Sequence, residues 1–197
     1  MVPTYPGILS GLLEKVSELD QKVGVLHALL DEQSPESLRA APVIYGPLGE
    51  CLLSDILLTL AKLYDRKADR SVFRLLSTAQ QAEIPWKTAL EASALSRHDA
   101  MIKDLNTTLN SIRSRRNKAI AHYDKVYFDA PTRLEDDFPL SAREVIAVLE
   151  ATQKILSEHS LCFDGSLRVS VGVFARVATL QMLTDLAAAS EQRGRHG

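Results

Sequence analysis

The sequence predicts an all-α fold, an up-and-down bundle of four to five main helices with an extra N-terminal helix. Apolar residues recur at spacings of three and four over long stretches, which is the period of an amphipathic helix. Leu and Ala dominate over Val, Ile and the aromatic residues, a bias toward helix and away from sheet. Glycine and proline are few, 9 and 8 of 197 residues, so few positions interrupt a helix.

A single domain is expected for the whole chain, because 197 residues can bury one core. Within residues 1–197 we expect an N-terminal helix at 7–33, a bundle core at 47–190 and a flexible tail at 191–197.

The helices are predicted in order along the chain. Ile8–Gln33 has an apolar face, and Ser34-Pro35 stops it. Residues 41–47 are expected to form a break or a kink. The helix that follows, from Pro47 or Leu48 to Tyr64, is apolar on most sides and is expected at the centre of the bundle. The remaining elements are a short helix Asp69–Gln81, one or two turns in Trp86–Ser96, a long helix Arg97–Tyr123, a loop Val126–Leu140, a helix Ser141–Glu158, a turn His159–Asp164 and a last helix Ser166–Ser190. Ser96 with Asp99 resembles a capping pair, and Ser141 with Glu144 matches a capping box.

Composition excludes several classes of function. The net charge of -2 gives no general attraction to nucleic acid or membrane, so such attraction must come from a local patch. Cys51 and Cys162 are widely spaced among apolar residues and are expected to be reduced, buried thiols. No CxxC or HExxH spacing occurs, so neither a metal nor a cofactor is expected. No window approaches the ~20 apolar residues of a membrane span, and the expected location is the cytoplasm.

The residues best suited to binding or catalysis lie at the end of the long helix. Arg113, Arg115, Arg116 and Lys118 place four cations within six residues, and His122 follows them. One interpretation is a solvated basic helix end that the helix dipole stabilises, with a histidine capping the last carbonyls.

Helix geometry favours a second interpretation of the same segment. At ~100° per residue Arg115 and His122 share a face, and Lys118 is one turn from His122. Arg116 falls on the apolar face, where a charge needs an acidic partner or a cleft. These groups could hold a phosphate while an imidazole acts on a hydroxyl proton. The other histidines, His27, His98, His159 and His196, are assigned no role.

The string RNKAIAHYD, residues 116–124, resembles the signature of the HEPN family, an arginine followed by a polar residue and, a few residues later, a histidine. The upstream run of residues 52–76, in which an apolar helix ends in Tyr64-Asp65, is similar to the abortive-infection branch of that family. The resemblance covers roughly residues 45–160, and only the arginine-to-histidine motif is specific.

The resemblance implies a homodimer with two motifs facing each other and a metal-independent endoribonuclease activity. His122 would be the acid/base for attack of the ribose 2′-OH on the adjacent phosphate, and Arg116 would stabilise the transition-state charge. Asn117 would orient the motif or a phosphate. Arg113, Arg115 and Lys118 would contact RNA phosphates, and Tyr123 would stack on a base or fill the core.

Three hypotheses remain open. The leading one is an RNA-cleaving toxin or phage-defence effector, with RNA (tRNA is one candidate) as substrate and an antitoxin protein as a partner. The alternative is a non-catalytic HEPN module that binds RNA, a nucleotide or a partner protein. The third is a plain helical scaffold with a basic helix end. The N-terminal and C-terminal helices are candidates for the dimer contact.

Overall fold

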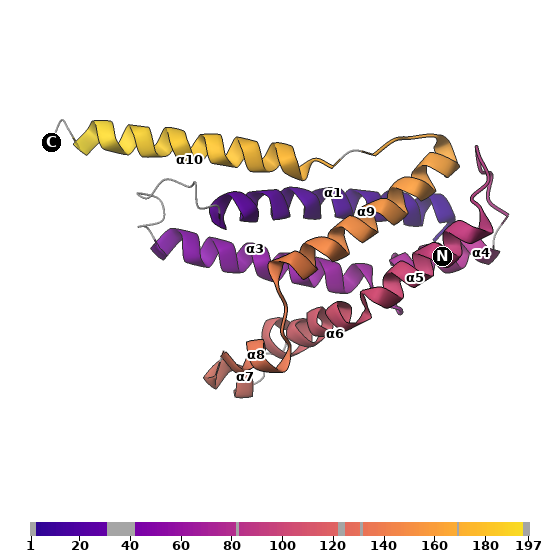
Figure 1. Cartoon of the computed structure of the whole chain (residues 1–197), viewed down its shortest axis with the longest axis horizontal. Coiled ribbons are helices and arrows are strands. Elements are labelled where there is room, and N and C mark those ends of the chain that lie inside the picture. The colour runs from indigo at the N-terminus through magenta and orange to yellow at the C-terminus, as the bar shows by residue number, and fades with distance from the viewer. Residues whose placement is uncertain are drawn as a thin grey trace. The chain divides into compact units, whose positions relative to one another are not determined.

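The all-α prediction is confirmed by the structure, a computed structural model that describes residues 3–30, 42–81, 83–121, 125–130, 132–168 and 170–194. Within these residues helices and connecting loops occur, and no strand (Figure 1). The helices are α1 (Tyr5–Leu30), α3 (Pro42–Leu63), α4 (Val72–Gln81), α5 (Ala92–Asp104), α6 (Asn106–Arg115), a π-helix η1 (Arg116–Ala121), α7 (Lys125–Asp129), α8 (Thr132–Asp137), α9 (Ala142–Asp164) and α10 (Gly172–Gly194).

The described residues fall into two compact units. The first takes the chain up to Val16 together with Leu57–Val169, and the second takes Ser17–Ile56 together with the chain from Ser170. The single domain expected at 1–197 stays a prediction. Buried apolar residues at helical spacing form the core of the first unit: Tyr5, Ile8, Leu9, Leu12, Leu60, Tyr64, Val72, Leu75, Leu76, Ile102, Leu109, Ile112, Val148, Leu149, Ile155 and Leu156. The second unit buries Leu19, Val23, Ala28, Ile56 and Leu183.

Of the break or kink expected at residues 41–47, the break is wrong from residue 42 onward, and the kink stays a prediction. Helix α3 begins at Pro42 and continues through Pro47. Proline is accepted at the start of a helix because the first turn has no use for its missing N–H. Pro47 lies just beyond that turn and costs the helix one backbone hydrogen bond. Ser34 and Pro35, where the first helix was expected to stop, lie outside the described residues.

The long helix expected at Arg97–Tyr123 is divided. Helix α5 begins earlier, at Ala92, and passes through Ser96 and Asp99, so the capping pair expected there is wrong. The N-cap is Glu91, whose side chain makes no capping bond. The helical run is interrupted at Leu105, whose φ of -86° and ψ of 0° fall outside the helical region. Helix α6 then continues to the π-helix.

The loop expected at Val126–Leu140 contains the short helices α7 and α8, which contact each other, and α7 also contacts η1. The capping box is confirmed, since Ser141 Oγ accepts from the Glu144 N–H and the Glu144 carboxylate accepts from the Ser141 N–H. The turn expected at His159–Asp164 is wrong, because α9 runs on to Asp164. Gly165, with a φ of 80°, supplies the left-handed residue that ends it.

In the second unit α10 begins against α1. The buried Asp20 carboxylate accepts from the backbone N–H groups of Val171 and Gly172, at 2.7 Å each, and from the Ser170 hydroxyl at 2.8 Å. These bonds satisfy donors at the helix start that no intrahelical carbonyl reaches. Gly24 lies beside the same turn, and a Cβ added to it would be 2.1 Å from the Gly172 carbonyl oxygen.

Gly24→Ala is therefore expected to destabilise the protein by about 2 kcal/mol, because backbone atoms cannot yield as a flexible side chain would. The effect is measured as a loss of unfolding free energy in urea. Gly7→Ala is the matched control on the same helix, since a Cβ there meets only the Thr4 hydroxyl at 3.5 Å. Equal stability of the two variants would contradict the close approach.

The two cysteines are free thiols, but the burial expected for them is wrong. Cys51 is exposed and Cys162 is half-buried. Cys51 lies nine residues before the fully buried Leu60, which places it on the opposite face of α3 at ~100° per residue. An apolar stretch of sequence did not reveal which side of the helix is covered.

Candidate functional site

The predicted motif begins where α6 changes into a π-helix. Residues Arg116–Ala121 form η1, whose hydrogen bonds join residues five apart along the chain instead of four. Short π-helical insertions are costly in regular helices and are frequent at functional sites. His122 and Tyr123, the expected acid/base and stacking residues, lie outside the described residues. Arg116 and Asn117 are therefore the described part of the expected catalytic set.

Arg116 is half-buried, and its guanidinium Nε donates to Asn117 Oδ1 at 2.9 Å. A side-chain amide that accepts from Nε restricts the rotation of the guanidinium and leaves its terminal N–H groups available for an anion. Through this contact Asn117 orients the Arg116 side chain. The role expected of Asn117 in orienting the motif stays a prediction.

The buried arginine with an acidic partner is Arg115, which corrects the placement of Arg116 on the buried face. Arg115 is 6% exposed, and its terminal nitrogens donate to both Glu135 carboxylate oxygens at 2.9 and 2.6 Å. Its Nε donates to the Phe138 carbonyl at 2.7 Å. Positions three and four after Ile112 share one helix face, so spacing alone did not decide between the two arginines.

This arrangement, the Arg115–Glu135–Phe138 clamp, ties the α8 segment to the first residue before η1. The charge-assisted hydrogen bond from Arg115 lowers the pKa of the Glu135 carboxyl. The RNA contact expected of Arg115 stays a prediction, and it would require the guanidinium to leave Glu135. Arg113 and Lys118 are exposed, and Arg113 donates to Asn110 Oδ1 at 3.4 Å.

The family model described as HEPN_AbiU2 (AbiU2) matches residues 9–185, which is well over half of the chain. The chain belongs to the HEPN family. This result confirms the resemblance to its abortive-infection branch, and the match extends beyond the motif to include most of α1 and more than half of α10. No curated protein and no solved structure gives a match.

Among the residues that the structure describes, no group of three or more His, Cys, Asp or Glu side chains is arranged to hold a metal ion. Over the same ranges, no helix combines the length and apolar character needed to cross a membrane.

A second cluster in the HEPN core was missed by sequence reasoning. His98 on α5 and His159 on α9 are 1% and 0% exposed, and their rings lie 5.2 Å apart. His98 Nε2 lies 2.6 Å from Glu158 Oε2, and Tyr5 Oη lies 2.7 Å from His159 Nδ1. Trp86 and Phe163 complete an aromatic shell around Tyr5. The sequence did contain a signal, because each histidine falls on the apolar face of its helix. His98 is four residues after Ala94 and four before Ile102, and His159 is four residues after Ile155 and three after Leu156.

The hydrogen bonds indicate which ring nitrogens of His98 and His159 carry a proton. A carboxylate only accepts, so His98 Nε2 donates to Glu158. Burial raises the pKa of Tyr5, so its hydroxyl stays protonated and donates to His159 Nδ1. Among the described residues His98 Nδ1 and His159 Nε2 are buried without a hydrogen-bond partner. Burial, together with the smaller effect of the neighbouring His98, lowers the pKa of His159 to about 4.

The depressed pKa of His159 predicts a loss of stability in acid. Between pH 6.5 and 4 the unfolded chain binds a proton that the folded chain does not, so unfolding becomes easier as the pH falls through this window. From pH 7.5 to 4.5 this residue should remove about 2.5 kcal/mol of unfolding free energy. His159→Gln keeps a polar group but does not titrate, and urea unfolding at both pH values should show a smaller loss than in the wild type. An equal loss in both proteins would refute the assignment.

Proposed function

We propose that this HEPN protein is a metal-independent endoribonuclease that acts as a toxin or phage-defence effector in the cytoplasm. His122 acts as the acid/base in the attack of a ribose 2′-OH on the adjacent phosphate, and Arg116 stabilises the negative charge that develops in the transition state. RNA is the substrate, with tRNA as the first candidate. The working form is a homodimer in which two motifs face one RNA, and an antitoxin protein restrains it.

The observation that carries the proposal is the half-buried Arg116 held by Asn117 at the start of a π-helix within the HEPN motif. An arginine that is already oriented loses little side-chain entropy when it meets a phosphate, which favours transition-state binding. The clamp made by Arg115 restricts the residue that directly precedes the motif. Together these contacts support a preorganised anion site, as catalysis of phosphoryl transfer requires.

The test is incubation of the purified protein with total RNA and with tRNA in EDTA. Cleavage that leaves 2′,3′-cyclic phosphate ends is expected, because the 2′-OH is the nucleophile and no metal-bound water takes part. Analytical ultracentrifugation of the same sample is expected to show a dimer. An intact RNA pool after incubation with a folded dimer would refute the catalytic proposal and favour the alternative of a HEPN module that binds RNA, a nucleotide or a partner protein.

A further inference from the structure

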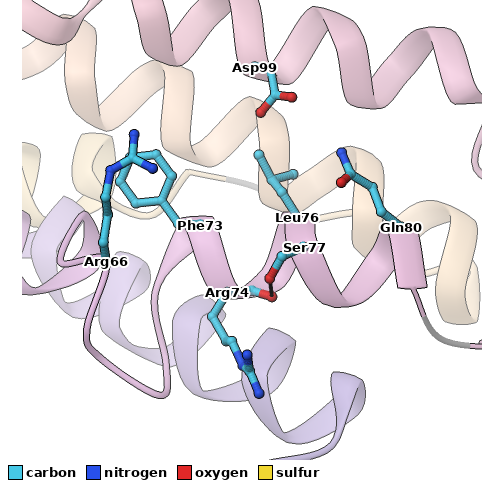
Figure 2. Close-up of a pocket in the computed structure, with 7 residues that line it drawn as sticks. All are labelled: Arg66, Phe73, Arg74, Leu76, Ser77, Gln80 and Asp99. Atoms are coloured by element: carbon cyan, nitrogen blue, oxygen red, sulfur yellow. Dashed lines mark hydrogen bonds between the residues drawn. The ribbon is translucent and has the colours of Figure 1, made fainter.

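A small hollow lies on the first unit between α4 and α5 (Figure 2). In Figure 1 α4 lies beyond the α5 end of the α5–α6 run, whereas the motif follows α6. The volume of the hollow is about 280 Å³, near the lower end of small-molecule pockets and suited to one nucleobase. The buried Leu76 lies between Phe73 and Gln80 in Figure 2, and Asp99 of α5 faces it. The lining residues are Arg66, Phe73, Arg74, Leu76, Ser77, Gln80 and Asp99.

One wall of the hollow is an aromatic platform built outward from the core. Tyr64 is buried, and its hydroxyl lies 2.8 Å from Thr152 Oγ1 of α9. The Phe73 ring packs edge-to-face against Tyr64 at 6.1 Å, and the Arg66 guanidinium lies 4.1 Å above the Phe73 ring centre. Each layer therefore restrains the next, and the outermost layer is a flat cation. A guanidinium that lies flat on a ring is held in one plane, and its N–H groups donate within that plane.

The rim of the hollow carries two groups of opposite hydrogen-bonding character. Arg66 offers only donors, and the Asp99 carboxylate offers only acceptors. Both side chains are exposed, and within the described part of the chain neither makes a hydrogen bond to another side chain. Gln80 can both donate and accept. Arg74 points to the other side of α4 in Figure 2 and takes no part in this argument.

We propose that this hollow, the Arg66–Asp99 pocket, binds an unpaired guanine of the RNA strand that reaches the motif. Guanine is the RNA base that presents two acceptors, O6 and N7, on one edge and two donors, N1–H and the N2 amino group, on the next. The acceptors suit the Arg66 fork, and the donors suit the two oxygens of Asp99. Uracil lacks the exocyclic amino group, and adenine lacks the paired acceptors. The inference rests on the proposed RNA substrate and adds a specificity subsite to it.

The distance from the pocket to Arg116 limits how many nucleotides separate the bound guanine from the phosphate at the motif. At ~1.5 Å of rise per residue, the helical run from Asp99 to Arg116 spans at most about 25 Å. A strand with a ~3.4 Å rise per stacked nucleotide crosses that distance in about seven nucleotides. A guanine bound in the pocket therefore lies within about seven nucleotides of the phosphate at Arg116.

The first experiment is calorimetric titration of the full-length chain with guanosine 5′-monophosphate and with uridine 5′-monophosphate. The guanine nucleotide is expected to bind at least about tenfold more tightly. Asp99→Asn replaces an acceptor by an amino group that faces the guanine donors, and it should abolish this preference. Asp104→Asn, an exposed change of the same kind on the same helix, is the control and should preserve it. Equal affinities for the two nucleotides, or a preference that survives in Asp99→Asn, would overturn the proposal.

The second experiment distinguishes an RNA subsite from a site for free nucleotides. Inactive His122→Ala protein in EDTA is titrated with 12-nucleotide RNAs that have one guanine or none. The guanine is expected to increase RNA affinity about tenfold in the parent and not in Asp99→Asn. RNA binding that ignores the guanine while the mononucleotide still binds would refute the subsite. Since neither titration depends on cleavage, failure of the wild type to cut RNA would refute the proposed activity and leave this inference intact.

Discussion

His122→Ala is expected to reduce RNA cleavage by about 10²- to 10⁴-fold, which is the range that a general acid/base contributes. The imidazole supplies a group near neutral pKa that can take the 2′-OH proton, and alanine supplies none. Cleavage is measured as the initial rate of product formation on one purified RNA in EDTA. Helicity and melting temperature should remain close to those of the wild type, because the predicted task of His122 is chemical.

The control for this variant is His27→Ala, which removes a half-buried histidine of α1 outside the motif. It should cleave RNA as fast as the wild type. A His122→Ala protein that keeps full activity would exclude the acid/base role, and one that loses its helicity would indicate a histidine needed for packing. Arg116→Lys is a useful companion, because lysine keeps the charge but loses the fork and the Nε donor to Asn117.

Local signals in the sequence predicted the fold well. Ser141 and Glu144 are three residues apart, and their reciprocal hydrogen bonds depend on little else, so the start of α9 was predicted correctly. The end of α9 was missed because the stretch before Gly165 contains polar residues that suggested a turn. In the structure His159 is buried against Tyr5 and His98, which favours the helix beyond its own propensity. Contacts between residues 61 or 154 positions apart leave no periodic signal.

The candidate motif is visible in the sequence, whereas the contacts that support it are not. The arginine-to-histidine spacing lies within seven residues, and its role as a site stays a prediction. The contact of Arg115 with Glu135 could not be predicted, because Glu135 lies in an acidic stretch that is typical of a loop. Which of two adjacent arginines is buried depends on the packing of α8 against α6. The π-helix could not be predicted either, since its hydrogen-bond pattern depends on tertiary contacts more than on the helix propensity of its residues.

The clamp itself yields the largest expected change in stability. Arg115 is 6% exposed in the wild type, and in Glu135→Ala its guanidinium retains only the Phe138 carbonyl as a partner. A buried charge that loses its counter-ion destabilises a protein by about 3 kcal/mol. For a chain of this size that corresponds to a fall in melting temperature of roughly 6 to 12 °C. Asp136→Ala removes a neighbouring exposed carboxylate and should change stability by less than about 0.5 kcal/mol.

Arg115→Met separates the clamp from an RNA contact. Methionine keeps the apolar stem, and Glu135, whose side chain is 65% exposed, can return to water. The expected loss is therefore smaller than in Glu135→Ala, about 1 to 2 kcal/mol. If Arg115 acts only within the clamp, the salt dependence of RNA binding stays the same in Arg115→Met. A salt slope reduced by about one would instead show that Arg115 leaves Glu135 for a phosphate. In that case Glu135 competes with RNA for the guanidinium, and Glu135→Ala should bind RNA more tightly than the wild type.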